Sequence, residues 1–291
     1  MGRLEGRAAI VTGASRGLGR AIALAMAAEG AAVAVAARTE QVWDERLPGT
    51  IGETVAAIKA AGGRAVAIRA DLLEPGDRVR LAEEARAALG PITILVNNAA
   101  FTAPGRPPKP GVEAPVKAAP KAEGSAKPVR VDWPTFMNTP VHAYRRHFDM
   151  VFAAYELMQL IVPDMKAAGY GAVINVTSGA SRMPGDGPYP DRSYGVLAGY
   201  GGSKVALEHL TQCAAYETAD HNIAVNALSP SKAIITPGVQ YYSKDFADTA
   251  SESDFAEAAV RLALVDPEVV TGKVVGHADV LDGSFRPYVH H

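Results

Sequence analysis

Short, continuously apolar runs alternate along the chain with longer segments in which apolar residues recur every three or four positions. This alternation is typical of parallel strands joined by crossover helices. The short runs are predominantly apolar, as strands covered on both faces of a sheet must be. Seven of them are expected as strands: Ala8–Val11, Ala32–Ala37, Ala65–Arg69, Ile92–Val96, Ala172–Val176, Ile223–Ala227 and Lys273–Val280.

The segments between these runs have the spacing of amphipathic helices, and glycines stand where helix C-terminal caps are expected. The alternation predicts an α/β fold, namely a Rossmann-like, doubly wound, seven-stranded parallel sheet with helices on both faces. Such sheets bind ligands in a crevice at the carboxyl ends of their strands. The expected helices are Leu18–Glu29, Ile51–Ala61, Asp77–Leu89, His142–Ala168, Tyr200–Ala219 and Ser253–Leu264, and the cap glycines are Gly30, Gly62, Gly90 and Gly169.

One long segment interrupts this rhythm. Residues 102–140 are rich in proline, alanine and lysine and have neither the strand nor the helix period. We expect either a lid over the active site or a solvated, polyproline-like excursion. A second connection, 182–199, is also lengthened and is expected near the substrate site. The 291 residues are otherwise expected to form one domain.

Composition and charge exclude several classes of protein. With 48% hydrophobic and 21% charged residues, the chain is not of disordered, collagen-like or coiled-coil type. A formal charge of −2 provides no broad positive field, so nucleic acid is not an expected partner. The longest apolar stretch, Ala21–Ala37, is too short for a membrane span, and no signal peptide is evident, so a cytoplasmic location is expected. The single cysteine, Cys213, is expected to be a small buried helix residue.

A glycine-rich turn follows the first expected strand and opens the first expected helix. Residues 12–19 read TGASRGLG, with the spacing Gly-x-x-x-Gly-x-Gly. Glycines let the backbone approach a pyrophosphate closely, while the free N–H groups at the start of the helix face the anion. In a strand–turn–helix unit, this pattern favours dinucleotide binding over a plain connecting turn.

The ribose end of this expected cofactor site has arginine in place of a carboxylate. The second strand ends Ala36-Ala37-Arg38-Thr39. A carboxylate there would accept a hydrogen bond from the 2′-hydroxyl of NAD, whereas arginine accommodates the 2′-phosphate of NADP. Arg16 and Arg38 therefore favour NADP(H), and NAD(H) stays open because both arginines can be ordinary surface charges. Asp71, at the end of the third strand, is the expected acceptor for the adenine amino group.

Tyr200 and Lys204 stand four residues apart at the start of a helix, so their side chains share one helix face. A free phenol has a pKa near 10 and releases its proton poorly at neutral pH. A neighbouring ammonium group stabilises the phenolate, so Lys204 is expected to lower the pKa of Tyr200. The preceding strand ends at Ser178 and is expected to bring a serine hydroxyl to the same edge of the sheet.

Together these features resemble the short-chain dehydrogenase/reductase family, and the resemblance covers nearly the whole chain. It implies a nicotinamide cofactor, hydride exchange between an alcohol and a carbonyl, and a homo-oligomer, either a tetramer or a dimer. Six motifs in family order carry the resemblance: TGASRGLG at 12–19, Asp71, Asn97-Asn98-Ala99-Ala100, Ser178, YGGSK at 200–204 and Asn226-Ala227-Leu228-Ser229-Pro230.

The resemblance also implies a role for each matching residue. Tyr200 would exchange a proton with the substrate oxygen, Lys204 would lower the pKa of Tyr200 and hold the nicotinamide ribose, and Ser178 would donate a hydrogen bond to the reacting oxygen. Fixed donors at that oxygen bind the transition state better than the ground state. The implied cofactor-binding residues are Gly13, Ser15, Arg16, Gly17, Leu18, Gly19, Arg38, Asp71, Leu72, Asn98, Ala99, Tyr200, Lys204 and Pro230.

One departure from the family pattern concerns proton relay. Family members usually have an asparagine in the helix before the fifth strand, where it helps to hold a water for this relay. Met150, or Val151 with a one-residue shift, occupies that place here. A thioether is a poor acceptor and cannot replace an amide, which puts the usual relay in question.

These observations predict an NADP(H)-dependent oxidoreductase that acts on a small-molecule secondary alcohol or ketone. The alternative is an NADP(H)-binding sensor or scaffold with little turnover, which Met150 and the basic insertion favour. No metal is expected, because His142 and His147 are five residues apart and lack the spacing of a helical zinc pair. The long connections contribute aromatic residues that suggest an apolar or ring-containing substrate, unless they pack on the loops themselves: Trp133, Phe136, Tyr189 and Tyr194.

Overall fold

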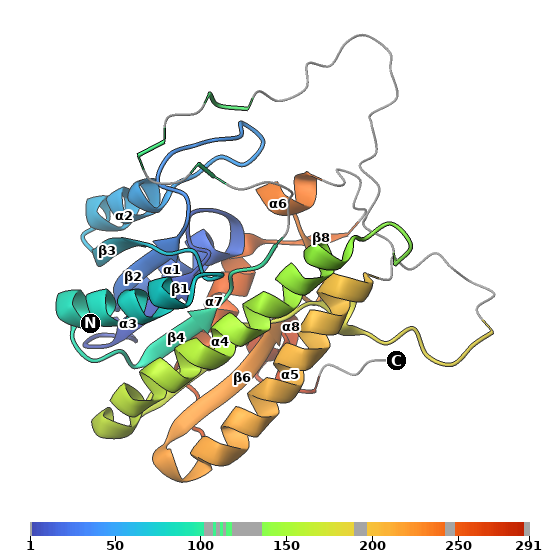
Figure 1. Ribbon diagram of the computed structural model, residues 1–291. Coiled ribbons are helices and arrows are strands. Elements are labelled where there is room, and N and C mark those ends of the chain that lie inside the picture. The colour runs from blue at the N-terminus through green and yellow to red at the C-terminus, as the bar shows by residue number, and fades with distance from the viewer. Residues whose placement is uncertain are drawn as a thin grey trace.

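The computed structural model describes residues 2–101, 107–108, 111–112, 115–117, 136–188, 197–241 and 248–287. Its centre is a parallel sheet of seven strands in the order β3-β2-β1-β4-β5-β6-β9 (Figure 1). This confirms the Rossmann-like, doubly wound fold. The strands are β1 Ala8–Thr12, β2 Ala32–Ala37, β3 Arg64–Arg69, β4 Ile94–Asn97, β5 Gly171–Val176, β6 Ile223–Ser229 and β9 Val274–Gly276.

Helices cover both faces of this sheet. The helices α1, α2, α7 and α8 pack on one face, and α3, α4 and α5 pack on the other, where α4 and α5 run side by side (Figure 1). Most strand residues are fully buried, which explains why the strands read as unbroken apolar runs. The helices are α1 Gly17–Ala28, α2 Ile51–Ala60, α3 Pro75–Leu89, α4 Val141–Ala168, α5 Ala198–Thr218, α6 Pro237–Gln240, α7 Glu252–Leu262 and α8 His277–Leu281.

The strand order reverses at β1, which pairs with β2 on one side and with β4 on the other. Successive connections leave β1 and β4 toward opposite faces of the sheet. A crevice therefore opens at the carboxyl ends of these two strands, where the glycine-rich turn and the residues after β4 lie.

The last strand is shorter than expected. The apolar run Lys273–Val280 is strand only over Val274–Gly276, and the chain then turns into α8. The backbone at Gly276 lies against Ser231, since an added Cβ would come within 2.4 Å of the Ser231 Oγ. The Ser231 N–H donates to His277 Nδ1 at 2.9 Å, so the chain is held to the loop after β6 and leaves the sheet there.

Several small elements escaped prediction, among them the helix α6 and the strands β7 Ala233–Ile234 and β8 Thr249–Ala250, which pair in parallel as a separate two-stranded sheet. The prediction for Cys213 was wrong, because its side chain is exposed on α5. Among the described residues, the chain has no helix with the length and apolar character that crossing a membrane requires. Most of the segment 102–140 and the residues 189–196, with Trp133, Tyr189 and Tyr194, lie outside the described residues.

Candidate active site

A large cleft lies at the carboxyl edge of the sheet. Its volume is about 840 Å³, within the range of small-molecule and cofactor sites. The walls come from the turn after β1, the ends of β2, β4 and β5, the first turns of α4 and α5, and the loop after β6. All residues that the sequence assigned to cofactor binding or catalysis line this one cleft: Gly13, Ser15, Arg16, Gly17, Leu18, Gly19, Arg38, Asp71, Leu72, Asn98, Ala99, Ser178, Tyr200, Lys204 and Pro230.

The glycine-rich turn is held against the residues that follow β4. Thr12 Oγ1 accepts hydrogen bonds from the backbone N–H groups of Asn98 and Ala99, at 3.0 and 3.1 Å. Asn98 Nδ2 donates back to the Thr12 carbonyl at 2.8 Å. Gly13 has a φ of +68°, and a Cβ there would lie 2.9 Å from both Ala99 Cα and Asn98 Nδ2. The close approach of the two loops therefore requires glycine.

Helix α1 starts directly from this turn with free backbone N–H groups. Its N-cap residue, Arg16, makes no side-chain capping hydrogen bond, and the first turn contains no acidic residue. The positive end of the helix therefore faces the cleft, as a pyrophosphate site requires. A Cβ at Gly17 would lie 3.3 Å from Thr236 Cβ, so the loop after β6 closes over this turn. Thr236 also lines the cleft.

Two arginines line the end of the cleft beside β2. Arg16 Nη2 donates to Thr39 Oγ1 and to the Gly49 carbonyl, both at 3.1 Å. The Arg16 Nε atom is buried and has no hydrogen-bond partner within the described residues. Burial lowers the pKa of Arg16, and the nearby positive charge of Arg38 lowers it further. Two adjacent cations, one with an unused buried donor, fit a phosphate dianion.

Asp71 and Leu72 follow β3 on the adenine side of the expected cofactor site. Asp71 Oδ1 accepts from the Leu73 N–H at 3.2 Å, and the Asp71 N–H donates to Asp77 Oδ2 at 2.8 Å. Asp77 is in turn bonded to Arg80 at 2.8 Å. These contacts hold the turn after β3 so that Asp71 lines the cleft.

Lys204 lies buried beside Tyr200 on α5. Its Nζ atom is 5.5 Å from the centroid of the Tyr200 ring and donates to the Val176 carbonyl at 2.7 Å. Burial lowers the pKa of Lys204 to about 8, and the Glu208 carboxylate opposes this shift. The lysine and the tyrosine thus share one face of α5, as their spacing predicts.

Ser178 completes the group from the end of β5. A side-chain hydrogen bond joins Ser178 to Tyr200, and Ser178 Oγ also accepts from the Ala180 N–H at 3.2 Å. Helix α5 rests directly on this loop, because a Cβ at Gly201 would come within 2.2 Å of the Ala180 carbonyl oxygen. The sequence analysis did not single out Gly201, whose small size brings the tyrosine and the serine together.

The pKa of Tyr200 shifts in the direction opposite to the one expected from sequence. Burial, which disfavours the phenolate, raises it, and the hydrogen bond with Ser178 lowers it. The helical spacing indicated that Lys204 lies near Tyr200, but it could not show how deeply the Tyr200 hydroxyl is buried. That Lys204 lowers the pKa of Tyr200 during the reaction stays a prediction.

Hydrogen bonds between buried polar side chains join β4 and β5 to α5, the helix that carries Tyr200 and Lys204. Asn97 Nδ2 on β4 donates to Asn175 Oδ1 on β5, and Asn175 Nδ2 donates to Thr211 Oγ1 on α5, both at 2.9 Å. Thr177 Oγ1 donates to the Glu208 carboxylate of α5. These bonds tie the two central strands to the helix that carries Tyr200 and Lys204. They fix the position of α5 relative to the sheet.

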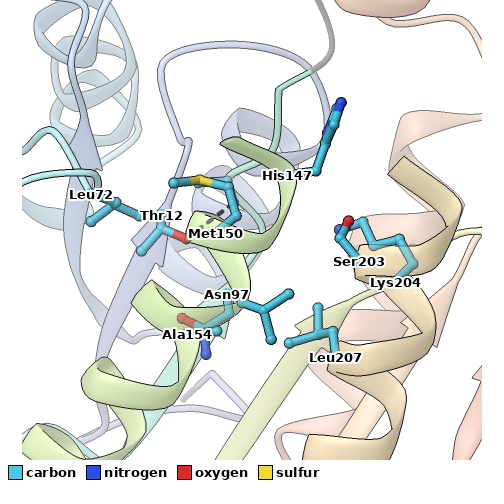
Figure 2. Close-up of a pocket in the computed structure, with 11 residues that line it drawn as sticks. Thr12, Leu72, Asn97, His147, Met150, Ala154, Ser203, Lys204 and Leu207 are labelled. Carbon is cyan, nitrogen blue, oxygen red and sulfur yellow. Dashed lines mark hydrogen bonds between the residues drawn. The ribbon is translucent and has the colours of Figure 1, made fainter. Parts of the chain in front are cut away.

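A small cavity adjoins the cleft between α4 and α5. Figure 2 shows His147 and Met150 projecting from α4 and Lys204 from α5 around this space. Its volume is about 20 Å³, and a water needs roughly 10–15 Å³. Met150, at the position where the family resemblance implied an asparagine, lines this cavity together with Lys204, and Figure 2 shows its side chain turned toward Thr12 and Leu72.

His147 is a site residue that the sequence analysis considered only as a metal ligand. Its ring meets the Tyr200 ring edge-to-face, with centroids 5.9 Å apart, and the Phe101 ring at 6.4 Å. Burial lowers the pKa of His147, and the Lys204 charge lowers it further. The signal in the sequence was its place one helical turn before Met150, on the same face of the helix.

The family model for short chain dehydrogenase matches residues 7–114 and 135–245, and the stretch between these two segments falls within 102–140. The chain belongs to the short chain dehydrogenase family. Members of this family are dehydrogenases that act on hydroxyl or carbonyl groups with nicotinamide cofactors. The chain is therefore an oxidoreductase.

Two relatives of this short chain dehydrogenase illustrate the range of similarity. It is 28% identical to a 7alpha-hydroxysteroid dehydrogenase of Escherichia coli over 288 residues, covering 94% of this chain and 93% of that protein. An uncharacterized oxidoreductase of Mycobacterium tuberculosis is 31% identical, with 94% and 92% covered.

Solved structures of short chain dehydrogenases show the same fold. A 7 alpha-hydroxysteroid dehydrogenase complexed with NADH and 7-oxo glycochenodeoxycholic acid is similar with a TM-score of 0.70, at 26% identity over 94% of this chain and 93% of that one. A putative NAD(P) dependent gluconate 5-dehydrogenase from Beutenbergia cavernae with bound NADP gives 0.68, at 26% identity over 96% and 98%.

Proposed function

We propose that this short chain dehydrogenase is an NADP(H)-dependent enzyme that interconverts a ketone and a secondary alcohol, with Ser178, Tyr200 and Lys204 as its catalytic residues. One observation carries the proposal. The three side chains come from β5 and α5 to one wall of the cleft, where Ser178 bonds to Tyr200 and the Lys204 ammonium lies 5.5 Å from the tyrosine ring.

The chemistry of the three side chains suits the reduction of a carbonyl. The nicotinamide, when bound, supplies the hydride. Negative charge then builds on the substrate oxygen, and the hydroxyls of Ser178 and Tyr200 can donate hydrogen bonds to it. Burial raises the pKa of Tyr200, which keeps the phenol protonated and ready to act as the acid. The Lys204 ammonium stabilises the phenolate that remains, and its pKa of about 8 keeps it mainly cationic at neutral pH.

The preference for NADP(H) rests on Arg16 and Arg38. Both line the cleft, and the buried Arg16 Nε–H can donate a hydrogen bond to an oxygen of a 2′-phosphate. NAD(H) is the alternative cofactor, and structures related to this chain contain NADH in one case and NADP in another.

We propose an apolar or ring-containing substrate. Two similar proteins are named 7alpha-hydroxysteroid dehydrogenases, and the cleft of about 840 Å³ includes Trp43 and Phe101 in its lining. Phe136 is 79% exposed, so it contributes no packing to this wall.

A homo-oligomer is the expected assembly, and a cytoplasmic location stays a prediction. Helices α4 and α5 expose large apolar side chains of the kind that a subunit contact covers: Phe152 at 64%, Tyr155 at 49% and Tyr216 at 86%.

The test is a screen of NADPH and NADH with a panel of ketones that includes oxosteroids, followed by the reverse reaction with the alcohols. Tyr200→Phe removes the acid and preserves the ring, so turnover should fall by roughly 10²- to 10⁴-fold while NADPH binding is retained. Turnover that survives this change would contradict the proposed role of Tyr200. NADPH binding without any turnover by the parent protein would instead favour the sensor or scaffold alternative, which Met150 motivates.

A further inference from the structure

The proton that the active site consumes must come from outside it. In the proposed reduction, each turnover moves one proton from the Tyr200 hydroxyl to the substrate oxygen, and the resulting phenolate must be protonated again before the next turnover. Tyr200 is only partly exposed, and Lys204 is 6% exposed. The pair therefore needs a group that connects it with water in the cleft.

The charged and titratable groups that face this pair are few in the described part of the chain. On α5, Glu208 is buried and accepts a hydrogen bond from Thr177 of β5. After β4, the Phe101 ring packs against His147, and the Arg38 guanidinium lies over this phenyl ring at 5.3 Å. On α4, His147 faces both Tyr200 and Lys204. A histidine is the side chain of this set whose ordinary pKa lies near neutrality.

The position of His147 is that of a connector. It lines the large cleft and also the small cavity between α4 and α5 that Lys204 lines (Figure 2). Its ring is held by packing, because a Cβ at Gly199 would lie 3.0 Å from the His147 Cδ2 atom. Phe101 and Tyr200 contact the ring by their edges or faces. Neither ring nitrogen has a hydrogen-bond partner among the described residues, so both can bond to water or substrate.

Met150 cannot perform this task, although it lines the same cavity. A thioether has no proton to give and accepts hydrogen bonds weakly. A neutral imidazole has one nitrogen that donates and one that accepts, so it can take up a proton on one side and release one on the other. Burial and Lys204 lower the pKa of His147, which keeps the ring in this neutral form at neutral pH.

We propose that His147 relays protons between water in the cleft and the Tyr200–Lys204 pair, with one water in the small cavity completing the path. This proposal rests on the proposed reduction. For each ketone reduced, one proton enters His147 from the cleft, its other nitrogen releases one, and the Tyr200 phenolate gains one. The two nitrogens exchange their roles and return to the first tautomer by exchange with water. The oxidation of an alcohol runs the same path outward.

The variant His147→Phe tests this proposal most directly. Phenylalanine preserves the aromatic contacts with Phe101 and Tyr200 and removes both nitrogens. The kcat of ketone reduction should fall by roughly 10- to 100-fold, at or below the lower end of general acid–base effects. The KM for ketone and the binding of NADPH should change little, because the ring still fills its place. The control is His209→Ala, an exposed histidine of the same helix as Tyr200, which should leave kcat unchanged.

Chemical rescue separates proton relay from packing. In His147→Ala, added imidazole should restore part of the lost kcat, and the restoration should grow with the fraction of neutral imidazole. Pyrazole, a ring of the same size and a far weaker base, should restore little. The double variant His147→Ala with Met150→Asn should also recover activity, because an amide can hold a water where the thioether cannot.

The proposal is overturned if His147→Phe retains the parent kcat and the parent solvent isotope effect across the pH range. Equal rescue by pyrazole and imidazole would also overturn it, because that result indicates that the added ring restores packing in the space left by the substitution and does not transfer a proton. These outcomes differ from failure of the proposed function, in which the parent protein itself turns over no ketone with either cofactor.

Discussion

Replacing Lys204 with methionine should weaken the dependence of folding stability on pH while it abolishes turnover. The lysine is buried, and its pKa falls from 10.5 to about 8. The unfolded chain therefore binds more protons than the folded protein between about pH 8 and pH 10.5, and stability rises with pH across that window. Below it, the folded protein carries the whole cost of a buried cation.

The structure sets the size of this effect. A fall of the pKa from 10.5 to about 8 corresponds to about 3 kcal/mol at neutral pH. The substitution also removes the hydrogen bond to the Val176 carbonyl, and an unsatisfied buried acceptor costs about 1–3 kcal/mol. At neutral pH the variant should therefore be as stable as the parent or more stable by up to about 2 kcal/mol. At about pH 9.5 the parent recovers about 2 kcal/mol of the cost, and the variant loses that much of its relative stability.

Equilibrium urea unfolding, followed by circular dichroism at about pH 7 and about pH 9.5, measures the difference between parent and variant. Taking the difference removes the contribution of groups common to both proteins. The matched control is Lys59→Met, an exposed lysine of α2, which should leave the pH dependence of the parent intact. If the stabilities of Lys204→Met and the parent change in parallel with pH, then Lys204 does not carry the cost that its burial implies.

Two further substitutions test the cofactor end of the cleft. Arg38→Asp should lower the ratio of kcat/KM with NADPH to kcat/KM with NADH by roughly tenfold or more, since one charge-assisted contact to phosphate is worth about 1.5–3 kcal/mol; an unchanged ratio would show that Arg38 does not contact the 2′-phosphate. Gly13→Ala should abolish cofactor binding, measured by NADPH fluorescence, because its Cβ would lie 2.9 Å from the loop after β4. Its control, Gly62→Ala, has a similar φ of +82° and open space around the new Cβ, so it should cost only about 1–2 kcal/mol of backbone strain and leave binding intact.

The sequence predicted well those parts of the fold whose structure depends only on neighbouring residues in the chain. Strands covered on both faces must be apolar at each position, so β2 appears as the run Ala32–Ala37 with its observed ends. The run Lys273–Val280 was predicted as a strand by the same rule, although it contains Lys273, His277 and Asp279. Its second half is a short helix with Val280 buried against α7, and the turn depends on the contact of Gly276 with Ser231, 45 positions earlier in the chain.

In the site too, the sequence predicted the features that nearby residues determine and missed those that depend on contacts between distant segments. The spacing of Tyr200 and Lys204 predicted that they share a helix face, and they do. The direction of the tyrosine pKa depends instead on how deeply α5 is buried, which spacing cannot reveal. His147 escaped for a related reason. It reaches the active site only because Gly199 lets α4 and α5 approach closely. His147 and Gly199 are 52 positions apart in the chain, and no local sequence pattern indicates a contact over that separation.

The contact of Gly201 with the Ala180 carbonyl has a consequence for how this enzyme can diverge. Any larger residue at 201 would place its Cβ about 2.2 Å from the Ala180 carbonyl oxygen, so α5 or the loop after β5 would have to shift and the contact between Tyr200 and Ser178 would change. This position therefore offers evolution no gradual route to a new specificity. Changes in substrate choice must therefore accumulate elsewhere along the cleft wall, where side chains can vary without moving the reacting groups. A library that randomises position 201 should yield survivors with glycine alone, whereas one at Trp43 should tolerate many residues.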